Sequence, residues 1–239
     1  GRVHALHVVG DGPEAIAFPP SRVEGTRRLV IEAGALFGAR PYRKYDFLLA
    51  FSDLVPHGGL EHHESSDNRL PERAWLDDAA FVVRGAGLLP HELVHSWNGK
   101  HRRPHGLIAP DFQQPVDTGL LWVYEGLTSY LGEVLTARSG LRSTRQELEV
   151  IASYAALMNA RTGRTWRSVG DTAASASVLG RSPREWRTSR RGVDYYTESL
   201  FIWLEADALI RERSGGTKTL DTFCRAFFGG WQTPEVVPY

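Results

Sequence analysis

The spacing of apolar residues predicts strands near the start of the chain and helices after them. Residues 5–9 form a short apolar run closed by a Gly-Asp-Gly turn, and residues 45–51 form a continuous apolar run that is too short for a helix. Between these two runs, residues 21–37 place apolar side chains at helical spacing, and Gly38 is expected to end that helix. Residues 58–63 begin with two glycines, which let another backbone approach closely, and are interpreted as a further strand.

Beyond residue 63 the chain is predicted to consist of helices and loops. Residues 64–78 are polar and contain a proline, which predicts a loop, and the three prolines within residues 100–117 exclude a regular helix there. A helical pattern covers residues 79–98, and Pro90 inside it is expected to lie in the first turn of a new helix. Further helices are predicted over residues 118–138, from Thr144 to Met158, over 194–213 and over 219–228, with a loop over 161–193.

Capping signals mark the starts of two of these helices. Asp117 or Thr118 is expected to cap the first of them. Thr144 and Glu147 are interpreted as a capping box for the next helix, which carries Leu148 at the start of its apolar positions.

Composition places the chain among soluble globular enzymes. It has 239 residues, of which 42% are hydrophobic and 23% charged. Lys and Arg together equal Asp and Glu at 28 each, so neither nucleic acid nor an anionic membrane is expected as a partner. No apolar run approaches the ~18 residues that span a bilayer, so a soluble cytoplasmic or periplasmic protein is expected. The single cysteine, Cys224, excludes an intrachain disulfide and is predicted to be a buried thiol. The excess of arginine over lysine indicates a GC-rich bacterial genome.

Residues 91–95 read His-Glu-x-x-His, and the predicted chemistry of the chain depends on this pattern. On a helix, His91 and His95 lie one turn apart on one face, where both imidazoles can reach a single metal ion. Glu92 lies about 100° around the helix from His91, close enough to reach a water molecule on that ion without binding the ion itself. Because zinc accepts two imidazoles, a carboxylate and one open position, one zinc ion per chain is predicted.

A two-histidine zinc site needs a third protein ligand, and Glu125 is the candidate. It lies within residues 121–130, a stretch so apolar that a buried carboxylate would be costly unless it were paired or bound to a metal. The alternative is that Glu125 is a surface glutamate on an amphipathic helix. The His-Glu-x-x-His pattern upstream favours the metal ligand over this alternative. His101 and His105 are also four residues apart, but Pro104 between them would break the helix that a second metal-binding pair requires.

These segments together resemble the glycyl aminopeptidase family of zinc metallopeptidases. The resemblance rests on His-Glu-Leu-Val-His-Ser-Trp-Asn at 91–98, on Lys-x-Arg-Arg-Pro at 100–104, and on Leu-Trp-Val-x-Glu-Gly-x-Thr-Ser-Tyr at 121–130. The 29 residues between His95 and Glu125 match the spacing of that family and exceed that of the related aminopeptidase N family. The resemblance implies an α+β, thermolysin-like zincin fold of the gluzincin type, in which His91, His95 and Glu125 bind zinc and Glu92 is the general base.

The same resemblance assigns two further sets of residues. Gly-Gly-Leu-Glu at residues 58–61 is similar to the substrate-binding strand of the family, which implies that Gly58, Gly59 and Leu60 line the peptide and that Glu61 binds its N-terminal ammonium group. Tyr195-Tyr196-Thr197 also resembles the family, and Tyr196 is implied to stabilise the oxyanion. The residues alone leave other readings open, because Glu61 could be a solvated carboxylate at a strand end and Tyr196 an interfacial aromatic residue.

We expect residues 1–239 to form a single peptidase catalytic domain with two lobes. The lobe over residues 1–65 leans towards strands and carries the substrate strand, and the lobe over 66–239 is mostly helical and carries the zinc site. Family members carry an N-terminal β-rich domain and a C-terminal PDZ-like domain, and both are expected to be absent from this chain. One departure concerns Glu198-Ser199, which stands where the family has Lys-Gly and reverses the charge beside Tyr196.

The predicted function is a zinc aminopeptidase that acts on peptides with a free, small N-terminal residue such as glycine or alanine. Two alternatives remain at this stage: a catalytically silent zinc-fold module that binds peptides or partner proteins, and an endopeptidase of the thermolysin type. The presence of Glu92 argues against the silent module, because a structural metal site needs no base beside its ligands. The endopeptidase would differ only in whether Glu61 closes the cleft.

Overall fold

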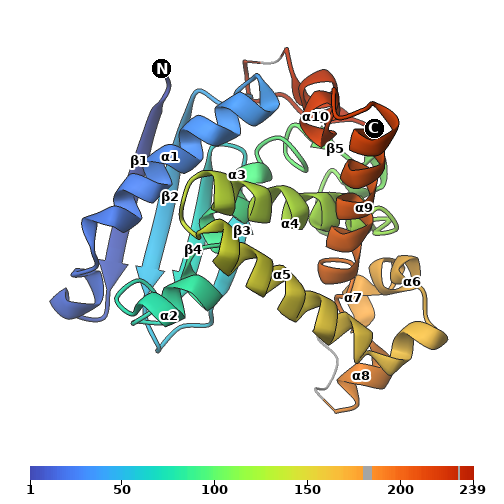
Figure 1. Cartoon of the computed structure of the whole chain (residues 1–239), viewed down its shortest axis with the longest axis horizontal. Coiled ribbons are helices and arrows are strands. Elements are labelled where there is room, and N and C mark those ends of the chain that lie inside the picture. The colour runs from blue at the N-terminus through green and yellow to red at the C-terminus, as the bar shows by residue number, and fades with distance from the viewer. Residues whose placement is uncertain (180–184, 231) are drawn as a thin grey trace.

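A four-stranded mixed sheet forms one side of the protein (Figure 1). The structure is a computed structural model that describes residues 1–179, 185–230 and 232–239. Strands β1 and β2 are parallel, β2 and β4 are parallel, and β3 runs antiparallel to β4, which gives the order β1-β2-β4-β3 with β3 at an edge. The strands are β1 (Val3–Gly10), β2 (Lys44–Phe51), β3 (Gly58–Glu61) and β4 (Ser65–Leu70).

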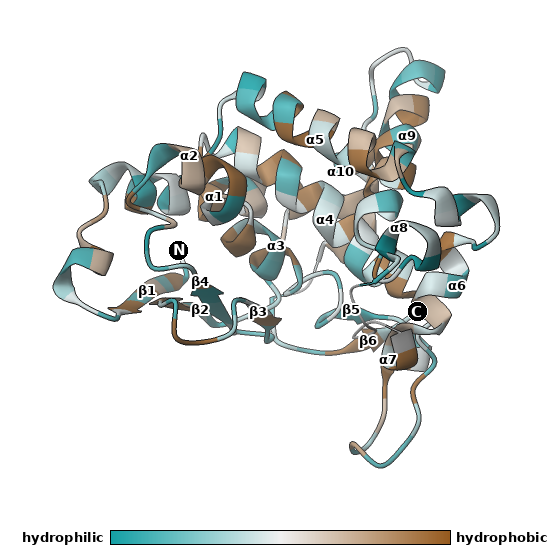
Figure 2. Ribbon diagram, turned by 90° about the horizontal axis from the view of Figure 1, so that it is seen from below, coloured by the Kyte–Doolittle hydropathy of each residue, from teal (hydrophilic) through white to brown (hydrophobic). Residues whose placement is uncertain are grey.

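Helices cover one face of this sheet (Figure 2). Helix α1 (Pro20–Phe37) follows β1 after a short 3-10 turn, η1 (Pro13–Ile16), and Gly38 ends it as predicted. Gly38 takes the left-handed conformation with φ 67°. Along β2, alternate residues are buried beneath the helices, so this strand is half-buried and not enclosed on both sides. Buried and exposed side chains therefore alternate along β2, as expected for a strand of which only one face packs against the core.

The polar segment predicted as a loop contains a strand, β4, so that prediction was wrong. Ser66 and Asn68 face the core, and the Asn68 amide donates hydrogen bonds to the Leu48 carbonyl oxygen at 3.1 Å and to Ser66 Oγ at 2.9 Å. Because β4 lies between β2 and β3, its backbone is paired on both edges. Pairing and internal hydrogen bonds thus hold a polar sequence in a strand.

The helical segment before the His-Glu-x-x-His pattern is divided into three pieces. One turn of helix, α2 (Asp78–Ala80), leads into a π-helical turn, η2 (Phe81–Gly85), and a new helix, α3 (Leu88–Val94), follows. Pro90 lies in the first turn of α3, as predicted, where its missing N–H breaks no hydrogen bond. Helix α3 ends at Val94, earlier than the predicted residue 98, and His95 is its C-cap.

The remaining long helices agree with the predictions except at their starts. Helix α4 starts after Leu120 and α9 after Tyr196, each three residues later than predicted. The capping box before α5 is formed by Ser143 and Gln146. On α5 the predicted Leu148 is 62% exposed, whereas the neighbouring glutamate is buried. These helices are α4 (Leu121–Arg138), α5 (Thr144–Asn159), α9 (Thr197–Arg213) and α10 (Leu220–Phe228).

Short elements occupy most of the segment that was predicted as a loop over residues 161–193. Ser168 caps one of them by accepting a hydrogen bond from the Asp171 backbone N–H, and residues 180–184 of this segment lie outside the described part. The elements are η4 (Thr162–Thr165), α6 (Val169–Ala174), α7 (Ala176–Leu179) and α8 (Arg187–Arg190). Elsewhere β5 (Arg102–Arg103) pairs with β6 (Val237–Pro238), and η3 (His105–Leu107) follows β5.

The core joins the sheet to the helices, with Trp97 stacked on Phe37 at 4.3 Å between ring centroids. Cys224 is fully buried, which confirms the predicted buried thiol.

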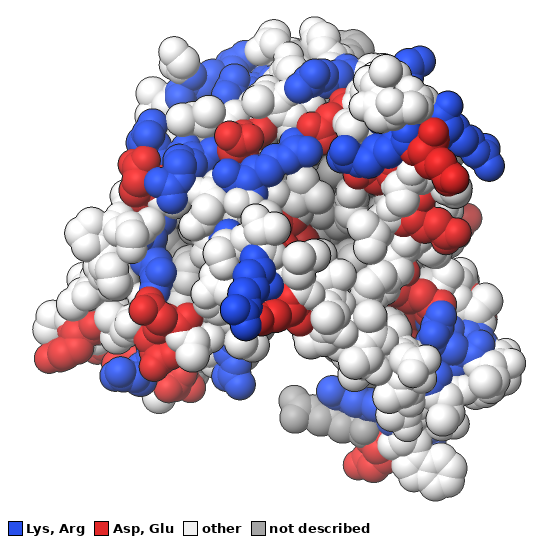
Figure 3. Space-filling view, viewed as in Figure 1, with Lys and Arg blue, Asp and Glu red and all other residues white. Residues whose placement is uncertain are grey.

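Acidic and basic side chains are interspersed on the face shown in Figure 3, which is hollowed between the part carrying α2 and the part carrying α8. Among the described residues, no helix is long and apolar enough to cross a membrane. The molecule is thus a mixed α and β structure in which helices predominate.

Candidate metal centre and active site

Helices α3 and α4 bring His91, His95 and Glu125 together, although 29 residues separate the last two in the sequence. The Nε2 atoms of the two histidines are 3.2 Å apart, and each lies 3.3 Å from Glu125 Oε2. A tetrahedral ion with ligand distances of about 2.0–2.1 Å requires about 3.3–3.4 Å between neighbouring ligand atoms. The triangle formed by these three atoms therefore has the dimensions of one face of a zinc coordination tetrahedron.

The charges around this triangle also fit a cation. Glu125 is 8% exposed, and its Oε2 is buried without a hydrogen-bond donor among the described residues. Burial opposes protonation of His95, but Glu125, Glu61 and Glu92 together raise the pKa of that imidazole to about 9. Three carboxylates thus converge on two imidazoles in a buried space, where unpaired negative charge is costly. The residues present fit a divalent zinc ion.

Asn98 fixes the orientation of His95. His95 Nδ1 donates to the Asn98 carbonyl oxygen at 3.0 Å, which leaves Nε2 as the ring atom that faces Glu125 and could bind a metal. The side-chain amide of Asn98 donates to the Tyr124 carbonyl oxygen and to Thr128 Oγ1, both at 3.0 Å, and so joins the end of α3 to α4. The sequence suggested no such role for Asn98, whose only signal was its place at the end of the motif over residues 91–98.

Glu92 lies beside the triangle and touches the edge strand of the sheet. It is 5% exposed, and this burial raises the pKa of its carboxyl group. Ligand atoms of Glu92, Glu61 and His95 all lie within 4.8 Å of one another. A Cβ atom added to Gly59 would lie 1.9 Å from Glu92 Oε1. Gly59 therefore makes room for the Glu92 carboxylate, whereas the family resemblance implied that this glycine lines the substrate peptide.

Gly59→Ala is expected to lower kcat more than ten-fold while the bound metal stays at the wild-type level. The new methyl group must displace the Glu92 carboxylate, and a displacement of about 1 Å at a reacting group costs about 10²-fold in rate. Steady-state kinetics together with metal analysis would measure both quantities. Gly192→Ala is the control, because a Cβ there meets nothing within 4 Å. Wild-type kcat in Gly59→Ala would contradict the assigned packing.

Glu61, at the end of β3, has two partners that the sequence did not suggest. Glu61 Oε1 accepts a hydrogen bond from the Tyr124 hydroxyl at 2.6 Å and lies 3.2 Å from Lys100 Nζ. Burial works against ionisation of Glu61, but His95 and Lys100 outweigh it and lower the pKa of this carboxyl below its ordinary value. Glu61 is therefore a fixed negative charge at the end of the candidate site, and not a freely solvated carboxylate.

The other residues predicted on this strand are accessible. Leu60 is 49% exposed, and Gly58 has φ 150°, a conformation that favours glycine, with open space where a Cβ would be. Since β3 is an edge strand, one side of its backbone is free of strand partners in the described sheet.

Tyr196 immediately precedes α9 and faces the same site. Its ring centroid lies 6.0 Å from that of His91, at an interplanar angle of 31°. Burial, with a further contribution from Glu125, raises the pKa of Tyr196 well above its ordinary value. The phenol therefore keeps its proton at neutral pH and can donate a hydrogen bond.

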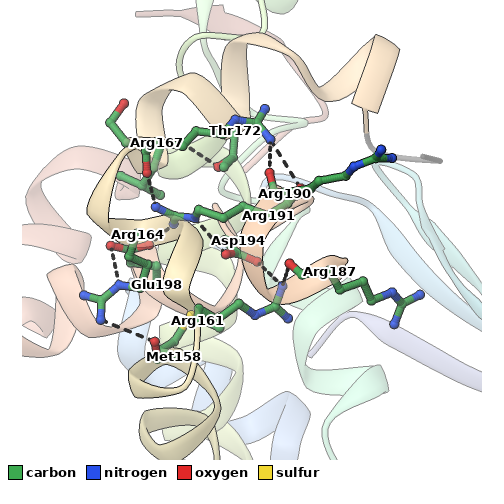
Figure 4. A network of polar contacts seen from close by, with 12 residues as sticks. Met158, Arg161, Arg164, Arg167, Thr172, Arg187, Arg190, Arg191, Asp194 and Glu198 are labelled. Atoms are coloured by element: carbon green, nitrogen blue, oxygen red, sulfur yellow. Dashed lines mark hydrogen bonds and ion pairs between the residues drawn. The ribbon is translucent and has the colours of Figure 1, made fainter. Parts of the chain in front are cut away.

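Two arginines neutralise the charge of Glu198, the residue at which the chain departs from the family pattern. Arg164 Nε lies 3.2 Å from Glu198 Oε1, and Arg191 pairs with the other carboxylate oxygen (Figure 4). Arg191 also binds Asp194 at 2.9 Å, so the same network holds the residues on both sides of Tyr196. The reversed sign therefore does not leave an uncompensated charge beside Tyr196.

The neighbouring Ser199 also has a structural explanation. It is fully buried, and a Cβ added to Gly126 would lie 2.2 Å from Ser199 Cβ. Helix α9 thus packs on α4 directly after Glu125, which places the start of α9 against the candidate metal centre.

Comparisons with known proteins agree with this fold. The M61 glycyl aminopeptidase family model matches residues 84–202, which include α3, α4 and the start of α9. Among solved structures, an aminopeptidase N family protein from Idiomarina loihiensis superposes with a TM-score of 0.79 and 22% identity, over 93% of this chain and 38% of that chain. Yeast LTA4 hydrolase in complex with bestatin gives a TM-score of 0.54 and 14% identity, over 88% of this chain and 29% of that chain. A search of curated proteins found no match.

The two solved structures share the fold of this chain, which spans 38% or less of their length. The family match spans the residues that form the candidate metal centre, including the His-Glu-x-x-His segment and Tyr196. These findings confirm the resemblance inferred from the sequence: the chain belongs to the M61 glycyl aminopeptidase family.

Proposed function

We propose that the chain is a zinc-dependent aminopeptidase that removes a small N-terminal residue, glycine or alanine, from peptides. The observation that carries this proposal is the position of Glu61, whose carboxylate lies within 4.8 Å of the ligand atoms of Glu92 and His95. A carboxylate that binds a free amine so close to these residues leaves space for one residue between that amine and the scissile carbonyl. An endopeptidase needs several residues there, so this spacing favours an exopeptidase.

Zinc would be held by His91, His95 and Glu125, and when bound it polarises a carbonyl group and lowers the pKa of a water molecule. Glu92 accepts a proton from the attacking water and passes it to the leaving amine, and burial raises the pKa of its carboxyl group, which makes it a stronger base. Tyr196 donates a hydrogen bond to the carbonyl oxygen as negative charge develops on it. Asn98 keeps His95 in the required tautomer.

The substrate backbone is proposed to lie along β3, the free edge strand of the sheet, in the manner of an added strand. Gly58 and Leu60 leave this edge open, while Tyr124 and Lys100 orient Glu61 at its end. The substrate ammonium group would join Lys100 on the Glu61 carboxylate. The preference for glycine and alanine rests on the family resemblance.

Glu61→Ala is expected to lower kcat/KM for glycyl and alanyl anilides by about 10–100-fold, the loss expected for one hydrogen-bonded ion pair. N-acetylated substrates, which lack the ammonium group, should change little. The control is Glu64→Ala, because Glu64 is similarly shielded but pairs with Arg43 away from the site. Equal losses on free and blocked substrates would argue against the role of Glu61, and zinc binding by the wild type without any hydrolysis would favour the silent module.

A further inference from the structure

A cavity of about 320 Å³ adjoins the candidate metal centre and has no part in the function proposed so far. Its lining includes His91 and Tyr196 from the candidate site, and also Glu133, Arg142 and Tyr154. The cavity thus joins the residues assigned to the chemistry to a charged cluster on α4 and α5.

The direction of the cavity follows from the two helices that line it. On α4, Ser129 and Glu133 lie one and two turns after Glu125, which corresponds to about 6 and 12 Å along the axis. On α3, Leu88 lies one turn before His91. The cavity therefore leads away from the candidate metal centre by about the length of one extended side chain.

Apolar residues form the walls of this cavity. Val83, Leu88 and Leu200 line it, and Gly132 contributes no side chain. A Cβ at Gly132 would lie 3.2 Å from His91 Cα, so α3 and α4 make their close approach at this glycine. The methylene groups of a bound side chain would meet these apolar walls.

A buried guanidinium group lies at the far end. The Arg142 side chain is 2% exposed, and its Nη1 donates to Glu133 Oε2 at 2.5 Å and to Glu147 Oε2 at 3.1 Å. Its Nε donates to the Val82 carbonyl oxygen at 2.7 Å. Three fixed acceptors thus hold Arg142 in place, which orders its remaining donors before any ligand arrives.

The donors that remain free face the cavity. Within the described part of the chain, Arg142 Nη2 makes no hydrogen bond, and it lies 3.3 Å from where a Cβ of Gly87 would be, in the cavity wall. Arg84 is exposed, also lines the cavity, and has no carboxylate partner among the described residues. Glu133 is already engaged at both oxygens, by Arg142 and by the Tyr154 hydroxyl. The cavity therefore offers guanidinium donors to a ligand.

We propose that this cavity binds the side chain of the residue after the scissile bond and selects glutamate, whose carboxylate is bound by Arg142 Nη2 and Arg84. The proposal rests on the proposed function, because it takes His91 and Tyr196 to mark the position of the scissile bond. A leucine there would leave buried N–H groups without acceptors, and a lysine would meet two like charges. Glutamine has the length of glutamate without its charge.

The test is calorimetric binding of four amidated tripeptides, Ala-X-Gly with X as Glu, Gln, Leu or Lys, to the zinc-loaded Glu92→Gln protein. The Glu peptide is expected to bind about ten-fold or more tightly than the Leu and Lys peptides, with Gln between them. Gly87→Val, which covers Nη2, and Arg84→Ala are each expected to bring the ratio of Glu to Leu affinities within about three-fold. Arg145→Ala, an exposed arginine of α5 outside the cavity, is the matched control.

Gly87→Val is preferred to a change at Arg142, because removal of Arg142 would leave Glu133 and Glu147 buried without a cation. Thermal unfolding verifies that each variant is folded. Equal affinities for all four peptides, no binding of any peptide, or a Glu preference that survives in both variants would overturn the proposal. Wild-type hydrolysis of glycyl anilide tests the peptidase separately, so a Glu preference without hydrolysis would contradict only the proposed function.

Discussion

Replacing Glu92 by glutamine is expected to lower kcat by about 10²–10⁴-fold while the chain retains one zinc ion, because this range is the usual contribution of a general base. Glutamine keeps the size of the side chain, and Glu92 is 5% exposed between α3 and Gly59, so the packing should be preserved. The amide cannot take a proton from water at neutral pH. Steady-state hydrolysis of glycyl and alanyl anilides, together with metal analysis of the same samples, measures both effects.

Glu149→Gln is a matched control for this substitution. Glu149 lies on α5, where it is exposed and pairs with Arg145, and it has no contact with the candidate site. Wild-type kcat in Glu92→Gln would refute the assignment of Glu92 as base. Loss of zinc from Glu92→Gln would instead place this carboxylate among the ligands.

His95→Ala is expected to abolish zinc binding and, with it, all hydrolysis. His95 is 1% exposed and supplies one corner of a triangle whose sides are 3.2 and 3.3 Å, and among the described histidines only His91 shares that group with it. Ligand binding at a thousand-fold excess over Kd stabilises a folded protein by ~4 kcal/mol. Zinc should therefore raise the Tm of the wild type by several degrees and leave that of His95→Ala unchanged.

The control for this experiment is His105→Ala. This histidine is exposed in η3 and belongs to no metal-binding group of the described residues. It should retain both zinc and its effect on Tm. One zinc ion per chain in His95→Ala, or removal of zinc from the wild type without loss of hydrolysis, would be incompatible with the proposed centre.

Local patterns in the sequence predicted much of the fold because their causes are local. The left-handed Gly38 that ends α1 and the position of Pro90 in the first turn of α3 both follow from the conformational limits of single residues. The predicted helix starts were less accurate where two neighbouring residues could each cap the helix. Ser143 and Gln146 form the capping box that was expected one residue later. On the same helix Glu147 is buried, whereas Leu148 is exposed.

The strand β4 shows what such patterns miss. Its residues are polar, and nothing in their order distinguishes them from a loop. They form a strand because β2 and β3 lie on either side and because the Asn68 amide finds acceptors on neighbouring backbone. Pairing with the two neighbouring strands decides this conformation, so the propensity of the segment itself does not report it.

The sequence by itself determined which side chains of this protein could bind a metal and which could act as a base. The spacing of His91, Glu92 and His95 fixes their relation on any helix, and the apolar stretch around Glu125 requires a buried partner for that carboxylate. Only the tertiary structure brought Glu125 to 3.3 Å from both imidazoles and placed Gly59 against Glu92. The tertiary structure also decided that Tyr124 and Lys100 hold Glu61 and that Arg142 faces a cavity. These contacts join elements that are distant in the sequence, and the sequence does not show which distant elements lie close together in space.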